Sequence, residues 1–347
     1  MIALALCGTL CGADSWADIE RFANGHIEWF EEFLELPFGV PSHDTFGRVF
    51  SKLDTDEFQN CLTRWVEQLQ FHLQGETVAI DGKTLRGSHD KTAAQQPLHV
   101  VNAWANGVNF CLGQVSVESK SNEIPALREL LEILKLKGAV VTADAMHCQK
   151  ETAKKIIKKQ ADYILQVKEN QSGLMKTIVH EFDRYAEENY ASSRVRQSTQ
   201  SERNRDRQET RTCMVAPAPA VLKQKWSGLQ TIGLMVRVRE TSDGKRSEAI
   251  SYFISSLSPR VREHAGHIRN HWRVENTLHY TLDVTFGEDA SRIRKGKGPE
   301  ITAALRRLAL SILKTDTTVN DNIRGKRVRA GYNLNTLKGI LLGFQAI

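Results

Sequence analysis

No apolar run in the chain approaches the roughly 18 residues that a transmembrane helix requires, so the sequence excludes a membrane-spanning protein. Six cysteines are scattered without a Cys-x-x-Cys pair or a histidine spacing typical of a zinc site, which predicts a reduced, cytoplasmic chain. The apolar opening segment resembles the core of a signal peptide, but it has no positively charged start. We interpret it as a buried first helix.

Nucleotide-binding and hydrolase motifs are missing as well. Gly82-Lys83-Thr84 resembles the end of a phosphate-binding loop, but the first glycine of that motif would fall at position 77, which is Thr77. The chain has no His-Glu-x-x-His, no Gly-x-Ser-x-Gly and no dinucleotide-type glycine fingerprint. These absences exclude a Walker-type nucleotide site and leave the acidic and basic residues as the candidates for chemistry.

Charge is unevenly distributed along the 347 residues, although the net charge is only +6 and the apolar content of 41% is that of a globular core. Residues 1–75 hold four basic against twelve acidic side chains, whereas residues 290–347 hold twelve basic against three acidic. An acidic head and a basic tail predict that a polyanionic partner meets the C-terminal part of the chain.

Helical periodicity dominates residues 16–73 and is interrupted by a Pro-Phe-Gly-Val-Pro-Ser break at residues 37–42. The following order of three strands, helix, strand, helix and strand is typical of a mixed α/β sheet with crossovers. A hairpin around Asn106-Gly107 joins the second and third strands. The expected strands are residues 78–80, 99–104, 109–117, 139–143 and 163–167.

A strand-rich segment interrupts this order at about residues 185–257. Helices return at residues 260–282 and 300–313. We therefore predict a helical N-terminal domain, 1–75, and a larger domain, 76–347, that contains the β-rich segment as an insertion. The insertion begins with Arg194, Arg196, Arg203, Arg205, Arg207 and Arg211, and its strand-like runs are residues 212–215, 229–238 and 250–254.

Two aspartates follow strand-like segments. Asp81 comes after residues 78–80, where an Asp-Gly pair taken alone favours a tight turn. Asp144 comes after residues 139–143, where a helix cap or a solvated acid is the simple interpretation. If the first and fourth strands are neighbours, however, the two carboxylates lie close together and repel each other unless a divalent cation is bound. Oxygen ligands favour Mg²⁺ or Mn²⁺.

A third carboxylate is expected from the helix at residues 260–282, where helical spacing places Glu275 on an apolar face. A buried glutamate needs a cation or a hydrogen-bond partner, and an internal pair with His271 is the alternative to a metal ligand. Glu288 and Asp289 are competing candidates just beyond this helix. Ordinary surface charge is the alternative interpretation for both.

Two carboxylates from strands and one from a helix are the set that two-metal phosphoryl transfer requires, so the chemistry indicates phosphodiester substrates. Nearby basic side chains could neutralise a DNA backbone, and a solvated basic face is the alternative for them. The candidate DNA-binding residues are Lys83, Arg86, Arg207, Arg211, Arg269, Arg273, Arg292, Arg294 and Lys295.

At these residues the sequence resembles the DDE insertion-sequence transposases, and among them the H-repeat-associated protein group. The resemblance extends over almost the whole chain, and its long C-terminal block is highly specific. It includes the short Arg-Gln-Glu-Thr-Arg motif at residues 207–211. The larger matching blocks are residues 41–50, residues 79–87 (Ala-Ile-Asp-Gly-Lys-Thr-Leu-Arg-Gly), residues 142–149 (Thr-Ala-Asp-Ala-Met-His-Cys-Gln) and residues 270–289.

The resemblance implies a ribonuclease H-like fold and a catalytic, metal-binding triad of Asp81, Asp144 and Glu275 with Mg²⁺ or Mn²⁺. It implies a homodimer on double-stranded DNA that cleaves at terminal inverted repeats with water and then joins the freed 3′ hydroxyl to target DNA. Two rivals remain open: a metal-dependent nuclease that never joins DNA, and a catalytically silent DNA-binding relic or regulator.

The chain departs from the wider superfamily around the glutamate. A tyrosine, an arginine and a lysine are expected at the positions of Ile268, His271 and Leu282, so the phosphate contacts of that signature have to come from other groups. The resemblance also places the first residue inside the helical head of the family, as if leading residues were absent.

Overall fold

The chain folds into two compact units, each assembled from segments that are far apart in sequence. The computed structural model describes residues 1–69, 71–89, 96–117, 123–187, 194–204 and 207–345. The division between the units passes through strand β1, between Asp81 and Gly82, and through the last turn of helix α10, between Arg273 and Val274. Unit 1 comprises Met1–Phe71, Gly82–Leu134 and Val274–Ile347, and unit 2 comprises His72–Asp81 and Lys135–Arg273.

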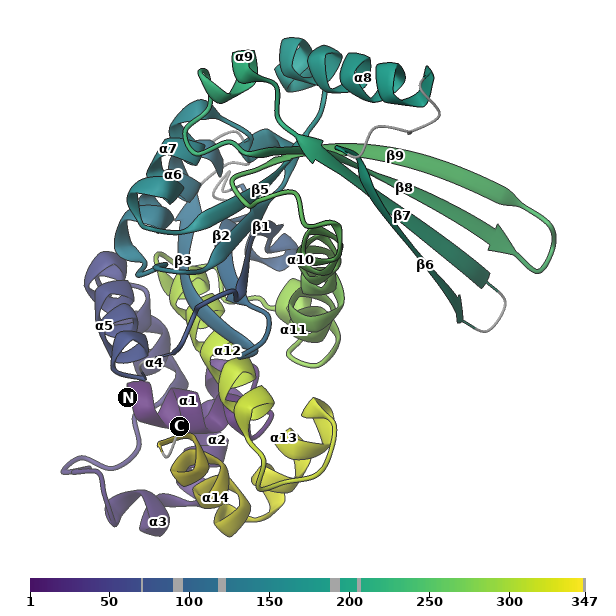
Figure 1. Ribbon diagram of the computed structural model, residues 1–347. Helices are drawn as coiled ribbons and strands as arrows, with labels where there is room; N and C mark the ends of the chain where they lie inside the picture. The colour runs from purple at the N-terminus through teal and green to yellow at the C-terminus, as the bar shows by residue number, and fades with distance from the viewer. Residues whose placement is uncertain (70, 90–95, 118–122, 188–193, 205–206, 346–347) are drawn as a thin grey trace. The chain divides into compact units, whose positions relative to one another are not determined.

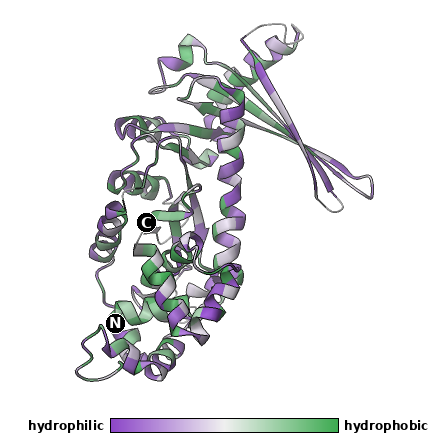
Figure 2. Cartoon of the chain, turned by 60° about the horizontal axis from the view of Figure 1, so that its bottom comes forward, coloured by the Kyte–Doolittle hydropathy of each residue, from purple (hydrophilic) through white to green (hydrophobic). Residues whose placement is uncertain are grey.

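Unit 1 begins with short helices whose ends are fixed by side chains. Ser15 and Asp18 form a capping box at the start of α2, and Asp54 accepts backbone N–H bonds at the start of α5. The first helix buries most of its apolar side chains, as expected from the sequence, and appears mainly hydrophobic beside the N-terminus in Figure 2. These helices are α1 (Ile2–Leu10), α2 (Trp16–Gly25), α3 (Ile27–Glu31), α4 (His43–Phe50) and α5 (Thr55–Gln68).

The rest of unit 1 contains an antiparallel hairpin and several helices. Strands β2 (His99–Ala105) and β3 (Phe110–Val117) pair from Ala105 and Phe110 outward, which confirms the predicted turn between them. Strand order in this unit is β3-β2-β1, where β1 contributes only its last residues, Gly82–Thr84. The helices are α6 (Glu123–Ile133), the π-helical segment Glu275–His279, α11 (Tyr280–Val284), α12 (Gly298–Thr315), α13 (Ile323–Tyr332) and α14 (Leu334–Gln345).

Unit 2 is built on a large mixed sheet with the strand order β1-β4-β5-β9-β8-β7-β6. Figure 1 shows its antiparallel strands β9, β8, β7 and β6 side by side. The first three strands of this order are parallel, and every pairing from β5 to β6 is antiparallel. The chain is therefore a mixed α/β protein, as predicted. The strands are β1 (Thr77–Thr84), β4 (Val140–Ala143), β5 (Asp162–Val167), β6 (Arg196–Asn204), β7 (Arg207–Pro217), β8 (Thr231–Thr241) and β9 (Arg246–Ser255).

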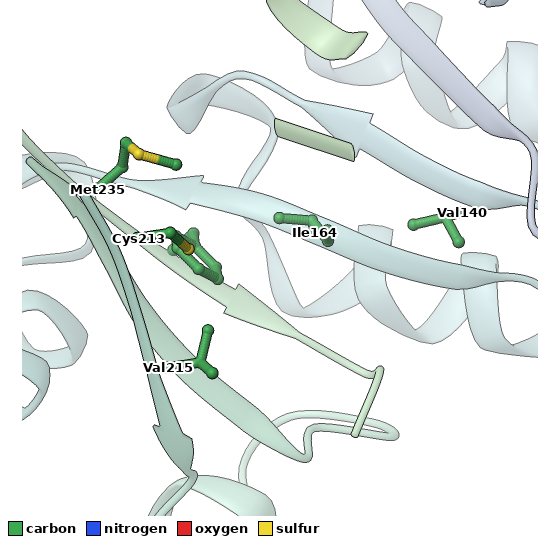
Figure 3. Packing of buried hydrophobic residues seen from close by; sticks show 6 residues of the cluster. Val140, Ile164, Cys213, Val215 and Met235 are labelled. Atoms are coloured by element: carbon green, nitrogen blue, oxygen red, sulfur yellow. The ribbon is translucent and has the colours of Figure 1, made fainter. Parts of the chain in front are cut away.

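A hydrophobic cluster joins the parallel and antiparallel parts of this sheet. Figure 3 shows its labelled side chains, which come from both parts: Val140, Ile164, Cys213, Val215 and Met235. Apolar residues of the α10 region pack against the cluster, so burial of apolar surface fixes this helix against the sheet. The helices of unit 2 are α7 (Lys150–Lys158), α8 (Ser172–Glu187), α9 (Ala220–Lys223) and α10 (Val261–Val274).

Strands β6 to β9 form a long ladder that extends beyond this core. Burial falls along β9 from a buried end at Ser255 to an exposed end at Arg246, and the far ends of the strands appear hydrophilic in Figure 2. Near the core, Gly233 provides space for the Phe253 ring, which a Cβ at this position would overlap. None of the described helices is long and apolar enough to cross a membrane.

Several sequence-based expectations need correction. Strand β1 continues to Thr84, so the tight turn considered for Asp81-Gly82 does not form. Gly82 instead lets β1 pass close to His99 and Glu123, because a Cβ there would contact both side chains. Strand β6 was not expected, since its sequence has no apolar alternation to mark it.

Candidate active site

The two aspartates are the first components of the site, and unit 2 contains both. Strands β1 and β4 are parallel neighbours, as the sequence-based argument required, and Ile80 is paired with Ala143. Asp81 and Asp144 are the next residues after this pair, so they occupy the same level on strands that lie about 4.8 Å apart. Two carboxylates at one level repel each other, and a divalent cation between them would offset this repulsion.

Asp144 is oriented by a histidine of α10. His271 Nε2 is 3.3 Å from Asp144 Oδ1, and His271 Nδ1 is 3.0 Å from Thr142 Oγ1. Because an ionised carboxylate only accepts hydrogen bonds, Nε2–H is the donor to Asp144, while Nδ1 lies within hydrogen-bond distance of the Thr142 hydroxyl. The two contacts together fix the ring orientation.

Electrostatics keeps Asp144 ionised. The hydrogen bond from His271 is the largest influence on the pKa of this carboxyl and lowers it, and partial burial acts in the opposite direction. Lys168 and His147 also lower the pKa, so the net value is below that of an ordinary aspartate. The side chain of Asp144 is 45% exposed, which leaves oxygen lone pairs accessible to an incoming cation. An ionised, accessible carboxylate fits a hard divalent ion.

Glu275 lies in unit 1 and differs from the expectation in its environment. Its side chain is 73% exposed, so the predicted apolar surroundings are wrong. The reason is local: Glu275 opens a π-helical segment, and the wider turn ends the α-helical periodicity on which that prediction depended. Its partner is His279, whose Nδ1 is 3.2 Å from Glu275 Oε2, whereas His271 is engaged by Thr142 and Asp144.

The competing acids Glu288 and Asp289 are both engaged in ion pairs within unit 1. Glu288 is buried and its Oε1 is 2.7 Å from Arg307 Nη1, so ordinary surface charge is the wrong interpretation for this residue. Asp289 is partly exposed and lies 3.6 Å from Lys83 Nζ and 3.5 Å from Arg86 Nε. Glu288 therefore has a structural partner that compensates its charge.

The candidate DNA-binding residues of unit 1 differ in exposure. Lys83 is buried, and its Nζ is 2.7 Å from Asp283 Oδ1. Arg86 is 84% exposed, Arg292 and Lys295 are exposed, and Arg294 donates from Nε to the Gly87 carbonyl at 3.0 Å. Exposed cations can reach a phosphate directly, whereas Lys83 would have to leave two carboxylates to do so.

The candidates of unit 2 lie on the ladder and on α10. Arg207 and Arg273 are exposed, whereas Arg211 is half-buried with Nη2 at 2.7 Å from Glu209 Oε1. Arg269 pairs with Glu202, which also lies 3.3 Å from Arg211. The arginines noted at 194, 196 and 203 lie at the start of the ladder or on β6, and Arg205 lies outside the described residues.

Sequence reasoning missed three groups around Asp144: Thr142, His147 and Lys168. One of them had a usable signal, because Lys168 directly follows β5, the parallel neighbour of β4. Residues beyond the carboxyl ends of parallel strands meet at one edge of a sheet. The contact of His271 with Asp144 had no such signal, since it depends on how α10 packs over β4.

Comparisons with known proteins relate the chain to one protein family. A family model described as "Transposase DDE domain" matches residues 72–312 of the chain. The chain belongs to the DDE transposase family. A second model, described as associated with that domain, matches residues 1–66 of this transposase-family chain.

Two relatives from Escherichia coli match the transposase-family chain over nearly its full length, and a third matches a short part of it. "Putative transposase YncI" of strain O157:H7 is 37% identical over 352 residues, covering 99% of this chain and 90% of the relative. "H repeat-associated putative transposase YhhI" of strain K12 is 34% identical, covering 99% and 92%. "Inactive transposase YbfQ" of strain K12 is 35% identical over 52 residues, covering 15% and 62%. The resemblance to the H-repeat-associated group is confirmed.

Proposed function

We propose that the chain is the DNA transposase of an insertion sequence, which cleaves phosphodiesters at the terminal inverted repeats of its element and transfers the freed ends to target DNA. The observation that carries the proposal is the register of β1 and β4, which brings Asp81 and Asp144 to one level of a parallel pair. Membership of the DDE transposase family supplies the context in which such acids act on DNA.

In this proposal Asp81, Asp144 and Glu275 are the catalytic residues and the ligands of Mg²⁺ or Mn²⁺. The bound ions would lower the pKa of the attacking hydroxyl and stabilise the leaving oxygen. His271 holds Asp144 in one orientation through its Nε2–H, and Thr142 holds the histidine. Glu275 directly follows the last residue of α10, the helix that carries His271, so chain continuity supports its role as the third acid.

We further propose a ribonuclease H-like catalytic domain. The strand orders β3-β2-β1 in unit 1 and β1-β4-β5 in unit 2, with β2 antiparallel to β3, support this fold. The division into a helical domain at 1–75 and a catalytic domain at 76–347 is supported by the change of family model between residues 66 and 72. Strands β6 to β9 would be the insertion at about 185–257.

The proposed partner is double-stranded DNA, bound as element ends and as target by a homodimer in the cytoplasm. The exposed candidates Arg86, Arg207, Arg273, Arg292 and Lys295 are those best placed to contact phosphates. Arg211, Arg269, Arg294 and Lys83 complete the proposed set, and each of these already has an internal partner.

Replacement of Asp81 tests the catalytic assignment. Asp81→Ala should abolish strand cleavage of a duplex that carries the terminal repeat, while binding of the same duplex in the absence of metal persists. Asp183→Ala, which removes an exposed acid of α8, is the matched control and should cleave like the wild type. Full cleavage by Asp81→Ala would sink the assignment.

Two further assays separate the rivals. A labelled, precleaved element end is joined to target DNA by a transposase, whereas a nuclease of the same fold cleaves DNA and leaves this end unjoined. A silent relic or regulator would bind DNA in a salt-dependent way and show no cleavage in Mg²⁺ or Mn²⁺. The test for DNA binding without cleavage is necessary because one relative is named an inactive transposase.

A further inference from the structure

One face of the β6–β9 ladder carries guanidinium groups in consecutive rows. Directly opposed residues of antiparallel strands point to the same face, and rows two residues apart share that face. One row is Gln200, Arg211, Arg237 and Ala249, and the next is Glu202, Glu209, Arg239 and Ser247. We call this surface the arginine face and define it by Arg207, Arg211, Arg237, Arg239, Glu202 and Glu209.

Helix α10 borders the arginine face. Arg269 of α10 forms an ion pair with Glu202 of β6, and the Arg237 guanidinium lies 5.9 Å from the centre of the Trp272 ring. The Trp272 side chain is 48% exposed and holds Arg237 by a cation–π contact. The face therefore has guanidinium groups from the sheet and from the helix, in positions that neighbouring side chains restrain.

Positive charge on this surface exceeds negative charge. Four arginines of the arginine face and Arg269 stand against the carboxylates of Glu202 and Glu209. Burial is the main cause that lowers the pKa of Arg237, and the neighbouring charges of Arg239 and Arg211 lower it further. Such crowding of like charge favours the binding of an anion with several charges.

The two glutamates of the arginine face have different environments. The Glu209 side chain is 7% exposed and is fixed between Arg211 Nη2 at 2.7 Å and Arg239 Nε at 3.0 Å. Glu202 is 41% exposed and bridges Arg211, at 3.3 Å, and Arg269, whose side chain is 48% exposed. Glu209 is therefore a structural ligand of the arginines, whereas Glu202 is an accessible carboxylate that an external anion can replace.

We propose that Glu202 occupies the position of a DNA backbone phosphate between Arg211 and Arg269, so that duplex DNA binds the arginine face by displacing an internal carboxylate. Carboxylate and phosphate oxygens accept the same paired N–H groups of a guanidinium, which makes them competing ligands. The inference rests on the proposed function and adds an autoinhibitory contact to the DNA-binding residues proposed above.

The spacing of the face fits an extended polyanion better than a single small anion. Same-face side chains recur about every 6.7 Å along a strand and about every 4.8 Å between strands. Arg207 and Arg211 on β7, with Arg237 and Arg239 on β8, therefore present a grid of cations to a chain of phosphates. Family membership selects duplex DNA over RNA as the polyanion.

Glu202→Gln tests the displacement. Binding of a terminal-repeat duplex, measured by fluorescence anisotropy in metal-free buffer, should tighten about fivefold, because the exposed ion pairs of Glu202 no longer have to break. The dependence on salt should stay the same, since the phosphates contacted in the complex are unchanged. Glu248→Gln is the matched control: Glu248 is exposed, belongs to a row of the opposite face and should leave binding unchanged.

Arg269→Gln completes a double-mutant cycle. Alone, it should weaken binding and reduce the slope of log affinity against log salt by about one, as expected when one phosphate contact is lost. When Arg269 is already replaced by glutamine, the additional change Glu202→Gln should increase the affinity for the duplex by less than it does in the wild type. Thermal unfolding of each variant shows whether the fold is retained, and both glutamate changes are isosteric at exposed positions.

The outcomes distinguish this inference from the proposed function. Glu202→Gln that binds DNA no more tightly than Glu248→Gln overturns the displacement, and so does a gain confined to an RNA duplex. If the wild type cleaves and joins element ends in that case, the proposed function stands without the inference. A wild type that binds no duplex DNA overturns both.

Discussion

At the scale of single residues, His271 stands where the wider superfamily has an arginine, and its contacts give it a different task. Its Nε2 faces Asp144 and its Nδ1 faces Thr142, so it orients one acid of the proposed metal site. Groups that hold a ligand by hydrogen bonds pre-organise it, and their loss weakens metal binding even though they do not touch the ion.

Replacement of His271 should therefore affect metal affinity. His271→Ala is expected to weaken Mn²⁺ binding about tenfold, measured by electron paramagnetic resonance titration without DNA. His271→Gln keeps an N–H donor and should restore part of the affinity. His180→Ala, an exposed histidine of α8, is the control. Equal affinities for wild type and His271→Ala would show that Asp144 does not need this support.

Glu288 stabilises the fold through a buried ion pair with Arg307. Burial raises the pKa of its carboxyl, but Arg307 and Arg306 lower it further than burial raises it, so the net pKa lies below the usual value. Asn102 accepts from Arg307 on the same buried network. A folded-state pKa below the unfolded value means that the pair stabilises the protein above about pH 4.5 and loses this effect as pH falls through the folded value.

Glu288→Gln should reveal this contribution. Because the change leaves Arg307 charged and buried, the free energy of unfolding at neutral pH should fall by about 3 kcal/mol or more in urea titrations. As pH falls below about 4.5, the variant should lose less stability than the wild type. Glu35→Gln removes an exposed acid of unit 1 and should change stability by less than about 0.5 kcal/mol. Parallel pH profiles for the wild type and Glu288→Gln would argue against the linkage.

At the scale of elements, the sequence predicted those strands that bury at least one apolar face. The expected strands at residues 99–104 and 163–167 match β2 and β5 closely, because continuous or alternating apolar residues mark a buried strand. Strand β6 consists largely of serine, threonine, glutamine and arginine and is exposed along most of its length. Its pairing with β7 comes from the backbone ladder, which hydropathy does not reveal.

The Phe253 ring of β9 lies directly over Gly233 of β8, where only a residue without a side chain leaves room for it. Gly233→Ala would place a methyl group within the Phe253 ring position, so we expect a loss of about 1–3 kcal/mol in the free energy of unfolding. Gly173→Ala is the control, because an added Cβ there meets no atom within 4 Å; it should be neutral or stabilise α8 by up to about 1 kcal/mol. Chemical denaturation of both variants measures the difference, and equal stabilities would contradict the packing argument.

At the scale of the whole molecule, part of the charge asymmetry is neutralised internally. Arg306, Arg307, Lys326 and Arg327 of the basic tail are buried in unit 1. Arg327 Nη2 lies 2.6 Å from Oδ1 of Asp14, an acid of the head, and Lys326 lies 2.9 Å from Asp316. These four cations hold the fold together, so only the exposed cations of the tail could meet a polyanionic partner.

The exposed part of the tail remains available to DNA. The double variant Arg292→Gln/Lys295→Gln should lower the slope of log affinity against log salt by about two, since each phosphate contact contributes about 0.9. Lys338→Gln, an exposed lysine of α14 outside the proposed set, should leave the slope unchanged. The measurement is duplex binding over a range of salt concentrations. An unchanged slope for the double variant would exclude the tail from phosphate binding.

Part of the candidate site, the position of Asp81 and Asp144 at one level, could be predicted from the sequence for a physical reason. Crossover connections make parallel neighbours of β1 and β4, and strand register then fixes the level of Asp81 and Asp144. The environment of Glu275 could not be predicted from the sequence, because it depends on a local change of helix type rather than on the residue pattern. Likewise, Glu288 meets Asn102 and Arg307 through tertiary packing of segments distant in sequence.

The π-helical segment Glu275–His279 also changes how relatives can be aligned with this chain. A π turn accommodates an extra residue, so it acts like a one-residue insertion absorbed inside a helix, and the following side chains are rotated by roughly 100° from their α-helical positions. If residues are simply counted from Glu275, the lysine of the wider superfamily falls on Leu282, which is fully buried. The next residue, Asp283, is partly exposed and forms an ion pair with Lys83. Homologous positions beyond Glu275 are therefore best assigned by superposition instead of by residue count.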